Sequence, residues 1–138
     1  MKREYSNPSA LPDWSGMFTQ IVTTEKQGLR LVHISGQVGV DQDKKIVGDG
    51  SLAAQTQQAL ENLKVALSHV GVSVNDVVKL TIYVADYQYE HAAVIREALR
   101  VVFPSDQLPA LSLIGIAALA EKEFLVEIDA EIVAETDQ

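Results

Sequence analysis

The stretch from residue 52 to residue 70 constrains the fold of this chain more than any other. Its apolar residues recur at spacings of three and four, which predicts a helix with one apolar stripe: Leu52, Ala59, Leu60, Leu63, Leu67 and Val70. Gly71 stands where a left-handed residue commonly follows the end of a helix. Because such a stripe must be buried, the helix has to lie on a sheet or on another helix.

Alternating segments predict that sheet. Residues 76–85 alternate with a period of two, as do residues 124–134, and this is typical of half-buried strands. In the first segment Val78, Leu80, Ile82 and Val84 would share one face, opposite Val77, Lys79, Thr81 and Tyr83. In the second, Phe124, Val126, Ile128, Ala130 and Ile132 would oppose Leu125, Glu127, Asp129, Glu131 and Val133.

The remaining elements are a second helix and four further strands. Asp86 is a candidate N-cap for a helix whose apolar face would be Ala92, Ile95, Leu99 and Val102, and Pro104 would stop it. The strands would be the first half-dozen residues, 17–24, 30–35 and 109–117. The order β-β-β-α-β-α-β-β predicts an α+β domain, a mixed sheet with both helices on one face. The opposite face mixes apolar and charged residues, which favours an oligomer.

Composition narrows the class of protein. A chain of 138 residues is expected to form a single domain, residues 1–138. A formal net charge of −8 disfavours a nucleic-acid partner. The absence of cysteine excludes disulfides and thiolate chemistry and suits a cytoplasmic location. We see no secretory signal and no apolar run of about 20 residues, so no membrane association is expected.

Three segments in fixed order resemble the Rid family, also called YjgF or UK114 and named endoribonuclease L-PSP-like. They are SGQVGVD, AAQTQQALENLKVALSHVGVSVNDVVKLTIYVAD and LPALSLIGIAALAEKEFLVEIDAEIV. The likeness runs from about residue 7 to residue 133. It implies a chorismate-mutase-like fold of the bacillus type and a homotrimer with a central β-barrel, with clefts at the three subunit interfaces. It also implies hydrolysis of a small-molecule enamine or imine, such as 2-aminoacrylate, without a cofactor.

The resemblance also assigns site residues, and three of them depart from the family pattern. The family motif P-A-R-[ST] carries an arginine for the substrate carboxylate, and here that position is Leu111, followed by Ser112. A tyrosine position is occupied by Phe18, and an asparagine position of the second helix by Ile95. The retained positions are Ser35, Gly36 and Glu127, which aligns with the glutamate that positions or activates water once one extra residue is allowed in the preceding turn.

Each of these residues has a plainer interpretation. Leu111 either makes the wall of a cleft apolar or only packs a strand. If it lines the cleft, leucine offers none of the paired donors of a guanidinium, so a 2-imino acid should bind poorly unless another cation substitutes. Glu127 is either a general base with a raised pKa or part of a solvated acidic edge with Asp129 and Glu131. Ser35 and Gly36 either approach a ligand closely or only form a turn.

The histidines carry less information. The period of two places His33 on the same face as Ser35 and Gln37, where a hydrogen-bonded structural role is favoured over proton transfer. His69 and His91 have no ligand spacing to each other or to a carboxylate pair, so no metal site is expected. The segments DQD, at 41–43, and GDGS, at 48–51, lack the rest of a calcium or phosphate loop and are interpreted as turns.

Two functions remain open at this point. The first is a Rid-like imine or enamine hydrolase, a deaminase in which Glu127 delivers water to a substrate that is not a 2-imino acid. The second is a non-catalytic trimer that binds a small ligand or a protein partner in the same cleft. Ribonuclease activity is discounted because no basic surface interleaved with aromatic residues is visible.

Overall fold

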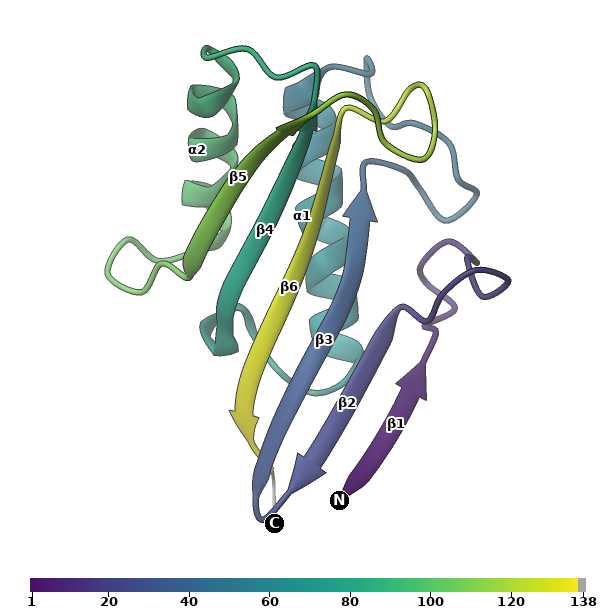
Figure 1. Cartoon of the computed structure of the whole chain (residues 1–138), viewed down its shortest axis with the longest axis vertical. Helices are drawn as coiled ribbons and strands as arrows, with labels where there is room; N and C mark the ends of the chain where they lie inside the picture. Colours follow the sequence, from purple (N-terminus) through teal and green to yellow (C-terminus); the bar gives the residue numbers. More distant parts are fainter. Residues whose placement is uncertain (137–138) are drawn as a thin grey trace.

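The computed structural model describes residues 1–136 and shows one curved sheet with both helices on the same face (Figure 1). The strands lie in the order β1-β2-β3-β6-β4-β5, and β5 is parallel to β4 whereas the other neighbouring pairs are antiparallel. The elements are β1 (Lys2–Ser6), β2 (Ile21–Lys26), β3 (Leu29–Val38), α1 (Leu52–His69), a short 3₁₀ helix (Val74–Asp76), β4 (Val77–Ala85), α2 (His91–Val102), β5 (Ala110–Ile116) and β6 (Val126–Glu135). This is the predicted mixed α+β arrangement.

The hydrophobic core lies between the sheet and the helices. Helix α1 packs on β3 and β6, and α2 packs beside α1. The largest fully buried apolar side chains are Ile21, Val32, Leu60, Leu63, Leu67, Leu80, Ile82, Ile95, Ile128 and Ile132. Each such side chain stabilises the fold by about 1.5–3 kcal/mol. The helical layer therefore fixes which sheet face is buried and leaves the other face, here called the open face, uncovered. In the part of the chain described, neither helix is long and apolar enough to span a membrane.

Both ends of α1 carry capping residues, of which Gly71 was predicted from the sequence. Ser51 is the N-cap, and its Oγ accepts a hydrogen bond from the Ala54 backbone N–H at 3.1 Å. Gly71 has φ +74, a left-handed conformation in which glycine avoids the strain of a side chain.

Two buried amides on α1 fasten the helix to the chain around β3 and β6. The Gln55 side chain donates to the Glu123 carbonyl and accepts from the Leu125 backbone N–H, at 3.0 and 2.9 Å. The Asn62 amide donates to the carbonyls of Val38 and Val40, at 3.0 Å each. Because unpaired buried backbone groups are costly, these bonds fix where β3 ends and β6 begins.

A β-bulge interrupts β3 at Ser35 and Gly36. Between residues 34 and 37 the strand advances by three residues, while its partner β6 advances by only two, between residues 130 and 128. Such an insertion bends a strand and re-aims its side chains. The bulge lies where the sequence places Ser-Gly, because glycine tolerates the irregular backbone.

The bulge overturns one expectation from the sequence. His33 and Gln37 do not share a face, because the inserted residue shifts the alternation. Gln37 is buried opposite Ile128, and its Nε2 donates to Gln20 Oε1 at 2.8 Å. The alternation of side chains predicts which sheet face a residue lies on only while the strand remains regular.

A second irregularity places Val77 and Val78 on the sheet faces opposite to those predicted. The pairing of β4 with β6 shifts register between Val77 and Lys79. Val77 is consequently buried and Val78 is 46% exposed, the reverse of the predicted pattern. From Leu80 onward the alternation follows the prediction, with Leu80 and Ile82 in the core.

Two predicted boundaries are also wrong. Strand β2 begins at Ile21, whereas residues 17–20 belong to a loop in which the Gln20 backbone N–H donates to the Asn7 side chain at 2.9 Å. Asp86 is not the N-cap of α2: it has φ +49, and its N–H donates to the Ile116 carbonyl at 2.8 Å, which extends the pairing of the β4 and β5 ends. The helix begins at His91 instead.

Candidate functional site

Glu127 lies on the open face near the start of β6, beside the bulge of β3. Its carboxyl group occupies the space that a side chain at residue 36 would need. A Cβ added to Gly36 would lie 2.5 Å from Glu127 Oε2 and 2.6 Å from Glu127 Cγ. Glycine at this position is therefore required for the Glu127 carboxyl to lie against the β3 backbone.

The surroundings of Glu127 disfavour its charged form. Partial burial raises the pKa of the Glu127 carboxyl above its usual 4.5, and the negative charge of Asp129 on the same strand raises it further. Burial also raises the pKa of Asp129, an effect that a hydrogen bond from Thr81 partly opposes. A carboxylate with a raised pKa is a better proton acceptor than one in free solution.

The open face beside Glu127 continues onto β4. Tyr83 pairs with Glu127 and Thr81 pairs with Asp129, so both of these acidic side chains have a β4 neighbour on the same face. A hollow of about 330 Å³ lies along the bulge and extends to Thr81, Asp129 and Glu131. Its lining is mainly polar, and it offers room for water next to the Glu127 strand.

Ser35 and Phe18 belong to the same end of the sheet. The Ser35 hydroxyl donates to the Thr19 carbonyl at 2.6 Å, which ties the bulge to the loop before β2. Within that loop Phe18 stacks on Trp14, with ring centroids 6.4 Å apart, and the Lys44 ammonium lies 4.4 Å from the centre of the Trp14 ring. Ser35 therefore holds the loop that carries these two aromatic rings, and its hydroxyl is engaged in that bond.

Leu111 and Ser112 lie on β5, at the outer edge of the sheet, and point to opposite faces. Leu111 pairs with Leu80 on the helix side and is 44% exposed. Ser112 pairs with Thr81 on the open face, where its Oγ accepts a hydrogen bond from Lys79 Nζ at 2.9 Å. β5 is two strands from β6, roughly 10 Å at about 4.8 Å per strand. One chain therefore does not bring these two residues together with Glu127.

Ile95 is placed in the core rather than on a surface. Its side chain is 1% exposed and is the one fully buried side chain of α2. The expectation that Ile95 contacts a ligand has no support in the described chain, since a side chain this deeply buried lines no open cleft. Its position follows from the apolar stripe of α2, which also includes Leu99.

His33 has one polar partner on the open face. Its Nδ1 lies 3.6 Å from Glu131 Oε1, and both side chains are more than half exposed. An ion pair this exposed contributes little stability. Among residues 1–136 no cluster of three or more histidine, aspartate or glutamate side chains could hold a metal ion.

Three neighbours of the site were not singled out from the sequence. Tyr83 lies beside Glu127, Thr81 bonds Asp129, and Lys79 bonds Ser112. The alternation of residues 76–85 places all three on the open face, but sequence spacing alone does not say which strand lies next to β6. That information comes from strand order.

The sheet, the two helices on one face and the glycine-supported glutamate define a small α+β domain of the endoribonuclease L-PSP class. The model of the family described as Endoribonuclease L-PSP matches residues 10–135, so the chain belongs to that family, which includes the Rid proteins. It is 32% identical over 134 residues to the 2-iminobutanoate/2-iminopropanoate deaminase of Dermatophagoides farinae, an alignment covering 97% of this chain and 98% of that protein.

Solved structures of the family agree with this fold. YjgF from E. coli superposes with a TM-score of 0.77 at 25% identity, covering 94% of this chain and 98% of that chain. The Rid-family protein YyfB from Yersinia pestis superposes with a TM-score of 0.72 at 36% identity, covering 96% of this chain and 98% of that one. The resemblance stated from the sequence is thereby confirmed at the level of family and fold.

Proposed function

We propose that this chain is a Rid-type hydrolase that converts a small imine or enamine to a carbonyl compound and ammonia. The observation that carries the proposal is the Glu127 carboxyl, half-buried against Gly36 with a raised pKa. Relatives named as 2-iminobutanoate/2-iminopropanoate deaminases support the reaction class.

In the proposed reaction Glu127 acts as the general base for water. The water oxygen bonds to the carbon of the C=N group while its proton passes to Glu127. The nitrogen takes this proton from Glu127, which gives a carbinolamine. Glu127 then accepts the proton of the carbinolamine hydroxyl and passes it to the nitrogen as the C–N bond breaks, so that the carbonyl product and ammonia leave. An enamine enters the same route once its carbon is protonated. No redox step or added co-reactant is needed.

The charges around Glu127 favour a substrate that is neutral or cationic. Glu127, Asp129 and Glu131 lie in one row on the open face, and a protonated imine would be attracted to them. Leu111 offers no donor to a carboxylate, whereas the family pattern has arginine there. A substrate with a free 2-carboxylate is therefore disfavoured at this site.

We further propose that the working unit is a homotrimer whose clefts combine residues of two subunits. Glu127 and Gly36 lie in the middle of the sheet, on β6 and β3, whereas Leu111 lies on the edge strand β5. A cleft that contains all three positions would therefore need a second subunit. The open face also exposes apolar side chains that include Leu31 and Val133, which pair across β3 and β6. Light scattering tests this directly, and a clean monomer would remove the interfacial cleft.

A second candidate is a non-catalytic trimer that binds a small ligand in the same cleft. It is favoured by the apolar residues Phe18 and Leu111 at positions where the family pattern is polar. A binder of this kind would retain affinity for a ligand after Glu127 is neutralised, and it would release no ammonia from any imine.

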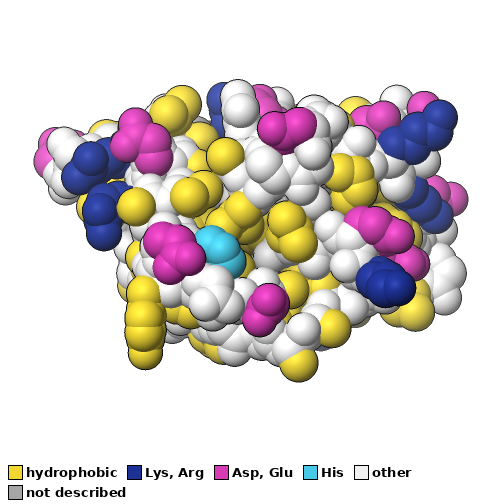
Figure 2. All heavy atoms as spheres, turned by 90° about the horizontal axis from the view of Figure 1, so that it is seen from above, with side chains coloured by type: hydrophobic (Ala, Val, Ile, Leu, Met, Phe, Trp, Pro, Cys, Tyr) yellow, Lys and Arg dark blue, Asp and Glu magenta, His cyan; other side chains and the backbone are white. Residues whose placement is uncertain are grey.

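Ribonuclease activity, which the family name suggests, has little support on this surface. The net charge of −8 repels a polyanion. In the view of Figure 2, acidic side chains are spread over the visible face while basic ones gather toward its two ends. No basic track for a phosphate backbone is visible there.

The test is ammonia release from a panel of imines. The panel contains 2-aminoacrylate, a neutral imine and a cationic iminium, each generated in place with the wild-type protein and Glu127→Gln. We expect faster release from the neutral or cationic imines and loss of that release in Glu127→Gln. Equal rates with and without wild-type protein on every member would overturn the enzymatic proposal and favour the binder.

A further inference from the structure

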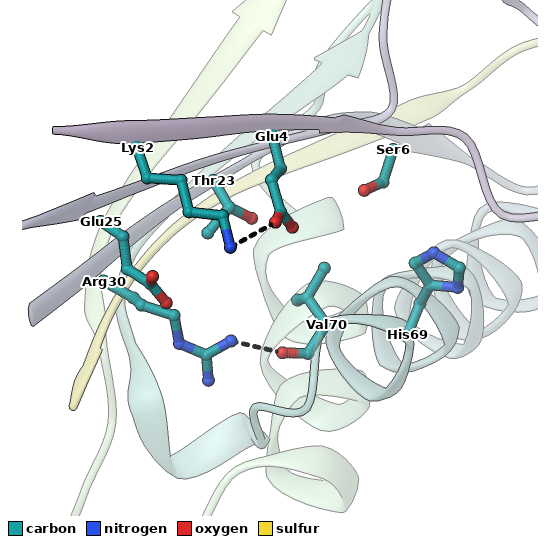
Figure 3. Close-up of a pocket in the computed structure, with 8 residues that line it drawn as sticks. All are labelled: Lys2, Glu4, Ser6, Thr23, Glu25, Arg30, His69 and Val70. Atoms are coloured by element: carbon teal, nitrogen blue, oxygen red, sulfur yellow. Dashed lines mark hydrogen bonds and ion pairs between the residues drawn. The ribbon is translucent and has the colours of Figure 1, made fainter. Parts of the chain in front are cut away.

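A second hollow lies away from the Glu127 site. It opens between the β1–β3 part of the sheet and the last turn of α1, and Figure 3 shows the side chains that line it. Its volume of about 280 Å³ is roughly nine times the 30 Å³ that one water occupies. It is smaller than sites for drug-sized ligands, which begin at about 300 Å³, so any guest is a small molecule.

Charges of both signs alternate across the floor of this hollow. Lys2 of β1 pairs with Glu25 of β2, and Glu25 pairs with Arg30 of β3, so the three side chains form one row on the helix side. Glu4 adds a second carboxylate, with its Oε1 3.0 Å from Lys2 Nζ. Two obligate cations and two carboxylates thus face one small space (Figure 3).

Arg30 is held in place but is incompletely bonded. Its Nη1 donates to the Val70 carbonyl at 2.7 Å, at the negative end of the α1 dipole. Its Nε is buried and has no hydrogen-bond partner among the described residues. The guanidinium is therefore fixed in orientation, with N–H groups left over for an acceptor.

Thr23 is the second incompletely bonded group. The residue is 7% exposed, it lines the same hollow, and its Oγ1 has no partner among residues 1–136. Buried hydroxyl and guanidinium groups without partners are uncommon, because each has lost its hydrogen bonds to water. Thr23 and the stem of Arg30 therefore form the closed inner wall of the hollow, and the charged side chains form its accessible lining.

We propose that this hollow binds a small zwitterion of the α-amino-acid type. The guest's carboxylate would lie toward Arg30 and Lys2, and its ammonium toward Glu25 and Glu4. A dianion would be repelled by the two carboxylates, and a dication by the two cations, whereas a zwitterion satisfies both signs.

This site is separate from the proposed catalytic one. Arg30 precedes Gly36 by six residues on β3, about 20 Å at roughly 3.3 Å per residue. It also faces the helix side, whereas Glu127 faces the open side. The inference therefore does not depend on the hydrolase proposal and can fail or hold independently of it.

The first test uses the wild-type protein, so it does not depend on the folding of a variant. L-serine is titrated into ¹⁵N-labelled protein and amide shifts are followed, with propionate and propylamine as probes that carry one charge each. We expect saturable shifts around Glu25, Arg30 and Val70 with L-serine at millimolar concentration, and at least tenfold weaker binding of both single-charge probes. Equal binding of propionate, or shifts confined to the surroundings of Gly36 and Glu127, would overturn the proposal.

Variants then assign the two charges. Arg30→Gln and Glu25→Gln should each weaken L-serine binding at least tenfold. Glu127→Gln and Glu61→Gln, whose positions lie outside this hollow, should leave binding unchanged. Because Arg30 also bonds the end of α1, Arg30→Lys is included as a variant that keeps the charge and loses the fork of donors. Unaltered serine affinity in Glu25→Gln would contradict the ammonium contact.

Discussion

The bulge of β3 and the edge strand β5 both carry residues that the family resemblance assigns to the substrate site, yet they differ in how much freedom they have. At the bulge, Gly36 and the Glu127 carboxyl fill one another's space, and any side chain at residue 36 would collide. On β5, Leu111 is 44% exposed, and its side chain could be replaced without disturbing the core.

The difference separates the chemistry of the site from its selectivity. Beside the group that would activate water, Gly36 cannot gain a side chain unless the Glu127 carboxyl moves. The residue that would meet the substrate sits on an edge strand, where substitution costs little stability. A family fold can therefore keep one reaction class while its substrate changes.

The largest effect is expected from Glu127→Gln. Gln keeps the shape of the side chain but cannot accept a proton, so turnover of the preferred imine should fall by about 10²–10⁴-fold. The measurement is single-turnover ammonia release, with circular dichroism to show that the fold is kept. A rate within about twofold of wild type would mean that the bulge region is structural only.

The next effect is expected from Gly36→Ala. The added methyl group overlaps the Glu127 carboxyl, which must turn away. The variant should therefore lose up to about 1 kcal/mol of unfolding free energy, because this side chain is flexible, and should also lose turnover. Urea denaturation measures the first loss. Gly16→Ala is the matched control, because no atom lies within 4 Å of the added Cβ there and stability should hardly change.

Leu111→Arg tests the edge strand. A guanidinium at this exposed position should improve binding of a 2-imino acid by about 1.5 kcal/mol, roughly tenfold in KM, while stability changes by less than about 0.5 kcal/mol. Steady-state ammonia release from 2-aminoacrylate checks it. Leu108→Arg, also on an exposed leucine but outside the motif, is the control. The same gain in Leu108→Arg would show a general charge effect instead of a specific contact.

A smaller effect concerns pH. Burial and the Asp129 charge raise the pKa of Glu127 above its unfolded value, so the folded state favours the protonated form. The stability this provides is complete below about pH 4.5 and is lost as the pH rises through the folded pKa. Glu127→Gln should thus be more stable than wild type at pH 7, and the difference should vanish near pH 4. Thermal denaturation of both proteins at the two pH values measures this difference in stability. A variant that is still more stable than wild type at pH 4 would contradict the raised pKa.

The smallest effect is expected at the link between β4 and β5. Lys79→Met and Ser112→Ala each remove one side of a 2.9 Å hydrogen bond, and each should cost about 1 kcal/mol. In a double-mutant cycle by urea denaturation, the pair should show a coupling energy of about 0.5–1 kcal/mol. Additive losses would mean that the bond contributes nothing in solution.

Regular stretches of the sequence predict their structure well. The stripe of residues 52–70 and the alternation of residues 124–134 report packing within a single element, which is a local property. The predictions fail where the chain is irregular: at the bulge after Ile34, at the register shift after Val77 and at the turn of Asp86. In each case pairing with a distant strand overrides the local pattern.

The sequence by itself determined the layer arrangement, the glycine after α1, the family and the apolar character of residue 111, because these depend on residue types at short spacings. Only the tertiary structure decided that Gly36 makes room for Glu127, and that Leu111 lies on the helix side while Ser112 lies on the open face. It also placed Lys2, Glu25 and Arg30 in one row. The physical reason is that register and bulges are set between strands that lie far apart in the chain, and no short window of sequence contains both partners.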